Sequence, residues 1–160
     1  MRLFLLAAIS KLTASESTWV NEKVLLMFVT TQFPATNLAP VDVCYVPVGP
    51  VISPLPFPNI SFSSVSVPNI FNIFVWAMPA QNNMTITPVS VGGAGPGTVS
   101  AATFGGTRML VSSVKTFFGG MPVNKCFGTT SHNGLPPVAA PYNSLGSQTI
   151  PSQVTLSVLT

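Results

Sequence analysis

The sequence predicts a mainly β protein of one domain, built from short strands. Its 160 residues include 16 prolines spread along the chain, which exclude a helical bundle because proline breaks helices. Only 6% of the residues are charged, against roughly a quarter in an average soluble domain. The longest apolar run, residues 3–9, is far shorter than the about 20 residues of a membrane-spanning helix. We therefore expect an apolar, proline-rich β protein that is not an integral membrane protein.

Segments rich in Val, Ile, Phe and Thr, bounded by Gly, Pro or Asn, are predicted to be strands. They are residues 24–30, 65–67, 72–76, 84–86, 98–103, 108–112, 115–118 and 154–159. Two long irregular stretches interrupt them. The prolines of residues 47–58 predict extended, polyproline-like backbone, and the glycines of residues 92–97 predict a loop.

Charge is concentrated near the N-terminus. Residues 1–26 carry five of the nine charged side chains, and the rest of the chain carries only Asp42, Arg108, Lys115 and Lys125. These basic groups are too sparse for a nucleic-acid-binding face. Because surface charge keeps proteins apart, we expect this chain to bury surface inside an assembly. The alternative is a β domain kept soluble by its many Ser, Thr and Asn residues.

Residues 1–26 are predicted to be an N-terminal extension of a domain that comprises residues 27–160. The extension fits a weak secretory signal, an amphipathic helix, or an upstream stretch of a gene whose natural start is Met27. We favour the last two, because the short apolar run is followed after one residue by Lys11.

A short pattern recurs along the chain and predicts three similar lobes around a pseudo-threefold axis. A bulky apolar residue, a proline, a small or branched residue and later an Asn occur at Phe33-Pro34, Met78-Pro79 and Met121-Pro122. The prolines are 45 and 43 residues apart, and each follows a strand-like run. Such a pattern ends a strand in a fixed turn.

The same repeat aligns candidate metal ligands. Cys44 stands ten residues after Pro34, and His132 stands ten residues after Pro122. With Cys126 they form a candidate zinc set, although zinc prefers four ligands and the fourth would be water, Asp42 or another chain. The alternatives are two buried thiols and a hydrogen-bonded histidine, or a Cys44–Cys126 disulfide in an oxidising compartment.

Enzymatic function is not expected. After residue 26 the chain has one Asp and no Glu, which excludes a carboxylate pair for glycoside hydrolysis. Counting alone allows a Ser–His132–Asp42 triad or a Cys126–His132 dyad, but no nucleophile elbow is present.

Several motifs of the sequence are similar to those of the PAAR-like domains of contractile injection systems, and they occur in that family's order over about residues 30–160. They are Val41-Asp42-Val43-Cys44, the prolines and asparagine at positions 54, 56, 58 and 59, Gly92-Gly93-Ala94-Gly95, Lys115 ahead of Gly120 and Pro122, residues 129–136, and Pro151-Ser152-Gln153. One departure concerns residues 125–128, which lack the Asp that usually precedes the family's histidine.

The resemblance implies a small conical fold with long Pro/Gly-rich loops that caps the trimeric β-helical needle of a type VI secretion system or phage tail. One tip per needle would sharpen it for membrane puncture and dock effectors. It would lie at the tip of the apparatus, in a virion tail or in the bacterial cytoplasm before delivery. In related proteins His and Cys residues hold zinc near the apex, and His132 and Cys44 occupy the marked positions. The alternatives are a secreted or virion β-structural module and an adaptor for a separately encoded toxin.

Overall fold

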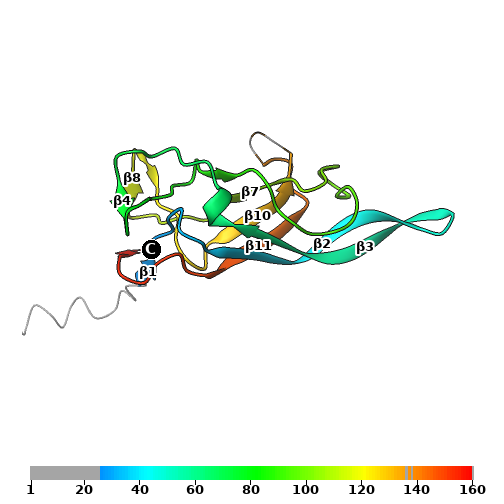
Figure 1. The fold of residues 1–160 in the computed structure, drawn as a ribbon, viewed down its shortest axis with the longest axis horizontal. Coiled ribbons are helices and arrows are strands. Elements are labelled where there is room, and N and C mark those ends of the chain that lie inside the picture. The colour runs from blue at the N-terminus through cyan, green and yellow to red at the C-terminus, as the bar shows by residue number, and fades with distance from the viewer. Residues whose placement is uncertain (1–25, 136, 138, 160) are drawn as a thin grey trace, which may run out of the picture.

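The computed structural model describes residues 26–135, 137 and 139–159. These residues are mainly β, as predicted, and their one helical element is the 3₁₀ turn η1 (Ser63–Val65). Figure 1 shows a molecule that is broad at one end, where β1, β4 and β8 lie, and narrows at the other end to the β2–β3 hairpin. Residues 1–25 of the extension predicted over residues 1–26 lie outside the described residues, and Leu26 is the first residue of β1.

A six-stranded antiparallel sheet forms the body, with the strand order β3-β2-β11-β10-β7-β6. Its strands are β2 (Thr36–Val48), β3 (Val51–Phe62), β6 (Ile86–Thr87), β7 (Gly106–Met109), β10 (Thr129–Gly134) and β11 (Ser144–Ile150). Strands β2 and β3 are much longer than the rest, so their hairpin extends beyond the sheet. Gly49, with φ +62°, occupies the turn where a two-residue hairpin needs a positive φ.

Three two-stranded ladders lie at the broad end. One pairs β1 (Leu26–Phe28) with β12 (Ser157–Leu159), the second pairs β4 (Phe74–Val75) with β5 (Met78–Pro79), and the third pairs β8 (Phe117–Phe118) with β9 (Met121–Pro122). The last two are hairpins whose two turn residues all have positive φ, at Trp76-Ala77 and Gly119-Gly120. The first ladder joins the beginning and the end of the described chain. We call the three ladders the base.

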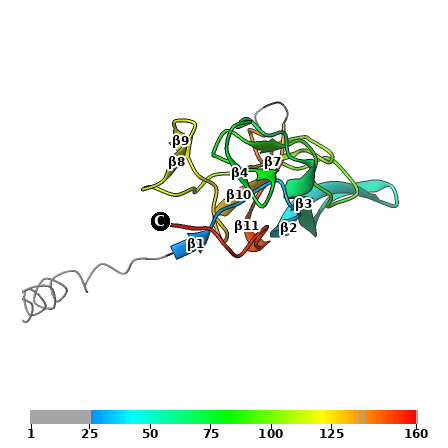
Figure 2. The same cartoon turned by 60° about the vertical axis from the view of Figure 1, so that its left-hand side comes forward.

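A closed ring of backbone hydrogen bonds connects the segments that follow these ladders. The N–H of Thr30 donates to the carbonyl of Asn124 at 2.9 Å, that of Asn124 to Gln81 at 3.0 Å, and that of Gln81 to Thr30 at 2.9 Å. A second set of three hydrogen bonds surrounds this ring. In it the backbone N–H groups of Cys126, Gln32 and Asn83 donate to the carbonyls of Phe28, Pro79 and Pro122, respectively. Three equivalent bonds of this kind place residues 30, 81 and 124 in equivalent positions. Figure 2 shows the surrounding ladders from another side.

The apolar core of the base repeats in the same way. Val29, Ala80 and Val123, each directly before a ring residue, are fully buried and form one cluster with Val158. Val75 and Phe118 pack against this cluster from two of the ladders, and Ile73 packs against it from the residue before β4. Elsewhere the buried side chains are mostly Ser, Thr, Asn and Gln, so hydrogen bonds hold the body together to an unusual degree.

The structure corrects the predicted repeat at Phe33-Pro34. The segment equivalent to Met78-Pro79 and Met121-Pro122 is Met27-Phe28. Like them, it forms one strand of a ladder and accepts a backbone hydrogen bond at its second residue, whereas among the described residues Phe33-Pro34 does neither. Pro34 lies in an exposed segment outside the ladders. The pattern search required a proline in each copy, and the first copy has Phe28 in its place.

Residues 47–58 have extended backbone as predicted, but they are not irregular, because they belong to β2, its turn and β3. Strand β3 is an edge of the sheet, and proline is tolerated at an edge where its missing N–H faces outward. The predicted strand over residues 98–103 is a turn and irregular segment, while the glycine-rich stretch 92–97 is largely irregular as expected.

Candidate functional site

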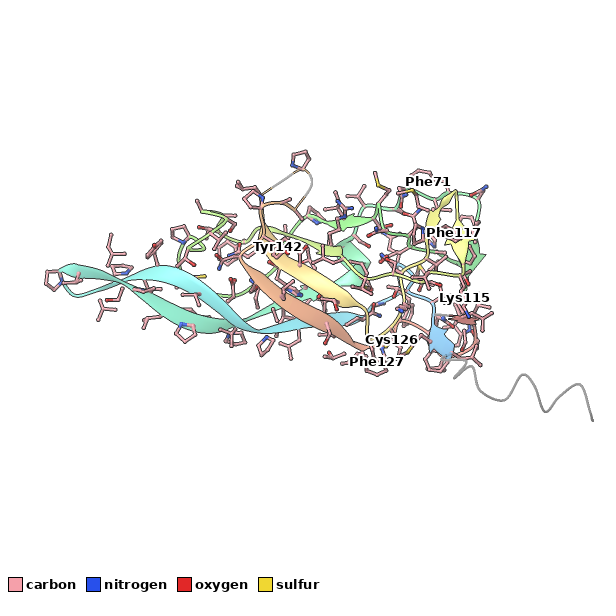
Figure 3. The ribbon with its side chains drawn as sticks, turned by 180° about the vertical axis from the view of Figure 1, so that it is seen from behind. Phe71, Lys115, Phe117, Cys126, Phe127 and Tyr142 are labelled. Carbon is pink, nitrogen blue, oxygen red and sulfur yellow. The ribbon has the colours of Figure 1, made fainter. Side chains whose placement is uncertain are left out.

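The base presents exposed apolar side chains from all three ladders. They are Leu26 and Leu159 on the first, Phe74, Trp76 and Met78 on the second, and Phe117 on the third. Phe74 and Phe117 hold equivalent places, since each pairs with the proline of its hairpin. Figure 3 shows Phe117, Lys115 and Phe71 at this end of the molecule. Exposed apolar side chains also occur elsewhere on the described surface, but their presence on all three ladders of the base indicates an interaction surface there.

A buried polar cluster lies in the body, around Asp42 of β2. Oδ2 of Asp42 accepts hydrogen bonds from the Nδ2 atoms of Asn59 at 2.8 Å and Asn133 at 3.1 Å. Oδ1 accepts a third bond, from Nδ2 of Asn143. Asp42, Asn59 and Asn133 are almost completely buried. A buried carboxylate needs such donors, because it has lost its hydration.

His132 of β10 extends this cluster. Its Nδ1 lies 3.0 Å from Oδ1 of Asn59, and its Nε2 lies 3.0 Å from the hydroxyl of Thr130. The amide nitrogen of Asn59 faces the carboxylate, so its oxygen accepts the Nδ1 proton, and Nε2 accepts from Thr130. Burial lowers the pKa of His132 from 6.5 to about 4, although Asp42 opposes this shift. The histidine is therefore neutral at pH 7. We call Asp42, Asn59, His132, Asn133 and Asn143 the clasp.

Cys44 lies at the edge of the clasp. Its Sγ is 4.0 Å from Nδ2 of Asn133, and an added Cβ on Gly93 would lie 2.6 Å from that sulfur. Burial and the nearby Asp42 raise the pKa of the Cys44 thiol. Of the predicted zinc ligands, His132 therefore belongs to the clasp and Cys44 lies beside it.

Cys126 does not join them. Its backbone N–H donates to Phe28 at the base, and Figure 3 shows it at the end of the sheet opposite Tyr142, the neighbour of clasp residue Asn143. Both cysteines are free thiols, so the alternative disulfide is not formed. Among the described residues, no three His, Cys, Asp or Glu side chains lie where they hold a metal together. Both nitrogens of His132 are already hydrogen-bonded, so the described arrangement does not fit zinc.

The catalytic combinations that the sequence allowed are not assembled either. The partners of the Asp42 oxygens are carboxamides, and Asn59 stands between Asp42 and His132. The one hydroxyl bonded to the imidazole is that of Thr130, which is buried. The clasp joins β2, β3, β10 and the segment before β11, and its arrangement serves to hold them together.

The comparison with protein families agrees with this architecture. The model of the family described as toxin PAAR-like domain matches residues 35–139. The chain belongs to this family. The matched part of the PAAR-like domain contains the whole clasp except Asn143, and two of the three ladders. No curated protein and no solved structure matches the chain.

Membership gives the protein a structural role at the spike tip or in association with toxins in secretion systems. Within the part of the PAAR-like chain that the structure describes, none of the helical segments has the length and apolarity to cross a bilayer.

Sequence reasoning missed the three asparagines of the clasp. Asn59 and Asn133 stood inside motifs that the resemblance used, but no role was attached to them. A usable signal was present: Asp42 is the one acidic residue after position 26. A single carboxylate within a strand of an apolar chain requires hydrogen-bond donors, and carboxamides are the abundant ones here.

Proposed function

We propose that this chain is a non-enzymatic spike-tip protein that caps the trimeric β-helical needle of a contractile injection system, with one chain on each needle. The observation that carries the proposal is the closed ring of Thr30, Gln81 and Asn124, with a ladder beside each. One chain thereby presents three equivalent backbone arrangements, which is what a threefold needle end requires of a monomeric cap.

The side chains of the base support the same proposal. Phe74 and Phe117 are exposed at equivalent places, and Leu26 and Leu159 are exposed on the β1–β12 ladder. Apolar contacts suit the blunt end of a needle because an unpaired charge buried there would be costly. The narrow end, formed by the β2–β3 hairpin, then points away from the needle and leads it toward the target membrane.

Binding to the trimeric needle protein of the same system tests the proposal. Phe74→Lys and Phe117→Lys each place a charge at the base, so we expect each to weaken binding at least tenfold. The matched control is Ile52→Lys at the narrow end, which should bind as wild type does. Binding that is unaffected by the two base substitutions would contradict the proposal.

A second candidate is an adaptor that carries a separately encoded toxin, which the toxin PAAR-like family description favours. The two functions are compatible if the toxin binds outside the base. Purification of the chain with its neighbouring gene products distinguishes them: an adaptor retains a toxin in the absence of the needle, whereas a cap alone retains only the needle.

A further inference from the structure

We propose that residues 45–54, the projecting section of the β2–β3 hairpin, insert into a lipid bilayer without external force. This inference deepens the proposed function and rests on it only for the direction in which the hairpin points. The ligand of the hairpin is the acyl-chain region of an uncharged membrane.

The projection begins where the hairpin leaves the rest of the molecule. The N–H of Tyr45 donates to Pro96 at 2.8 Å, and Cys44 forms a bridge with Gly97. Beyond Tyr45 the described residues make no backbone hydrogen bond to the hairpin except those within it. Four residue pairs, from Tyr45↔Pro54 to Val48↔Val51, extend further. At about 3.3 Å per residue they reach roughly 13 Å, which is close to half of the about 30 Å hydrocarbon core.

The projection is apolar on both faces. Its strands carry Val46, Pro47 and Val48 on one side of the turn and Val51, Ile52 and Pro54 on the other, with Ser53 as the one small polar residue among them, and Ile52 is 69% exposed. No charged residue occurs between Asp42 and Arg108. A hairpin that packs one face on a protein alternates apolar and polar residues, because its other face meets water. Apolar residues at successive positions suit a medium that surrounds the hairpin, as lipid does.

The prolines remove backbone donors from the edges of the projection. Ile60 of β3 exchanges hydrogen bonds with Val91 on the side away from β2, so even-numbered positions of β3 direct their nitrogens outward. Pro54, Pro56 and Pro58 are at even-numbered positions, so their nitrogens, which carry no hydrogen, face outward. On β2, Tyr45 bonds outward to Pro96, and Pro47 shares its parity. Ile52 is thus the one strand residue of the projection with an outward-facing, unbonded N–H.

Two consequences follow from these edges. An edge with a single donor, at Ile52, pairs poorly with another strand, which argues against a second copy or an added peptide strand as the partner. In lipid each unpaired backbone polar group is costly, so the absence of these donors lowers the cost of insertion, although the outward-facing carbonyls of the described hairpin still lack partners. Tyr45 stands at the start of the projection, where an aromatic ring with a hydroxyl fits the membrane interface.

Flotation of the full chain with phosphatidylcholine vesicles tests the inference. These vesicles carry no net charge, so the basic residues of the chain do not bind them electrostatically. We expect wild type to float with the vesicles and Ile52→Lys to partition at least tenfold less. The matched control is Val114→Lys, which adds the same charge at a residue that is 71% exposed outside the hairpin. It should partition within twofold of wild type.

Insertion depth gives a second measurement. Ile52→Trp, in a chain whose Trp19 and Trp76 are replaced by Phe, should emit at shorter wavelength with vesicles and be quenched by brominated acyl chains. A wild-type chain that does not float, equal losses for Ile52→Lys and Val114→Lys, or a dimer that forms without lipid and is abolished by Ile52→Lys would each overturn the inference. The needle-binding experiment separates the two proposals, because Ile52→Lys should still bind the needle.

Discussion

Nδ1 of His132 donates a hydrogen bond to Oδ1 of Asn59 at 3.0 Å, and this bond joins β10 to β3 across the intervening strands of the sheet. Asn59 in turn donates to Asp42 at 2.8 Å. The neutral imidazole, the carboxamide and the carboxylate thus form one directional chain of hydrogen bonds. Because every member is buried, the loss of one leaves its neighbours without partners and without water.

Acid should destabilise the protein through His132. Its pKa is about 4 in the folded state and near 6.5 in the unfolded state, so the unfolded state binds more protons between these values. This contribution to stability is complete above pH 6.5, and about 3 kcal/mol of it is lost as the pH falls to 4. Urea unfolding of wild type and His132→Gln from pH 7 to 4 measures it. His132 is the one histidine of the chain, so the variant should show a flatter profile, and parallel profiles would contradict this assignment.

Removal of the central carboxamide should cost considerable stability. Asn59→Ala takes one donor from Asp42 and leaves the Nδ1 proton of His132 without an acceptor, so we expect a loss of about 3 kcal/mol at pH 7. The control is Asn72→Ala on the exposed surface, which should change stability by less than about 0.5 kcal/mol. Chemical denaturation compares the two. Equal effects would mean that the clasp does not stabilise the sheet.

The body of the fold was harder to infer from sequence than its class. Short strands, turn residues and sparse charge were enough to predict a mainly β protein. The long hairpin was not predicted, because the number of prolines in residues 47–58 was taken to indicate an irregular polyproline-like stretch, and the spacing of Pro54, Pro56 and Pro58 was not considered. Their alternation, at every second residue, is the signal of an edge strand whose outward positions need no donor. Likewise, Met27, Met78 and Met121 mark the equivalent ladders, but a search that required proline missed the first.

The candidate site was predictable in part. Cys44 and His132 were selected, and they lie beside the same carboxylate. Cys126 was grouped with them by residue type, although its place before β10 puts it near the base. Residue type alone does not say which partner a buried group finds, and here Nδ1 of His132 bonds to Asn59.

The arrangement of the clasp predicts that stability does not depend on zinc. Both nitrogens of His132 are bonded, and the Cys44 thiol has a raised pKa, which disfavours the thiolate that zinc binds. Chelation of the purified protein with EDTA should leave the melting temperature within about 1 °C of its starting value. Metal analysis of wild type, His132→Ala and Cys44→Ala completes the test. One zinc per wild-type chain that both substitutions remove would contradict this prediction and establish the zinc site.

The glycine-rich segment should be sensitive to added side chains where it crosses the hairpin. A Cβ on Gly95 would collide with the backbone carbonyl of Tyr45, whereas one on Gly49 would meet no atom within 4 Å. We expect Gly95→Ala to cost about 3 kcal/mol and Gly49→Ala about 1 kcal/mol, the latter from its positive φ alone. Thermal unfolding of both variants provides the comparison. A Gly95→Ala protein as stable as wild type would show that the segment does not seat on β2.

The native mass of the complex between this chain and its needle protein tests the central claim most directly. If one chain supplies the three equivalent ladders of the base, native mass spectrometry should find one tip for three needle chains. A complex with three tips, one for each needle chain, would contradict the account.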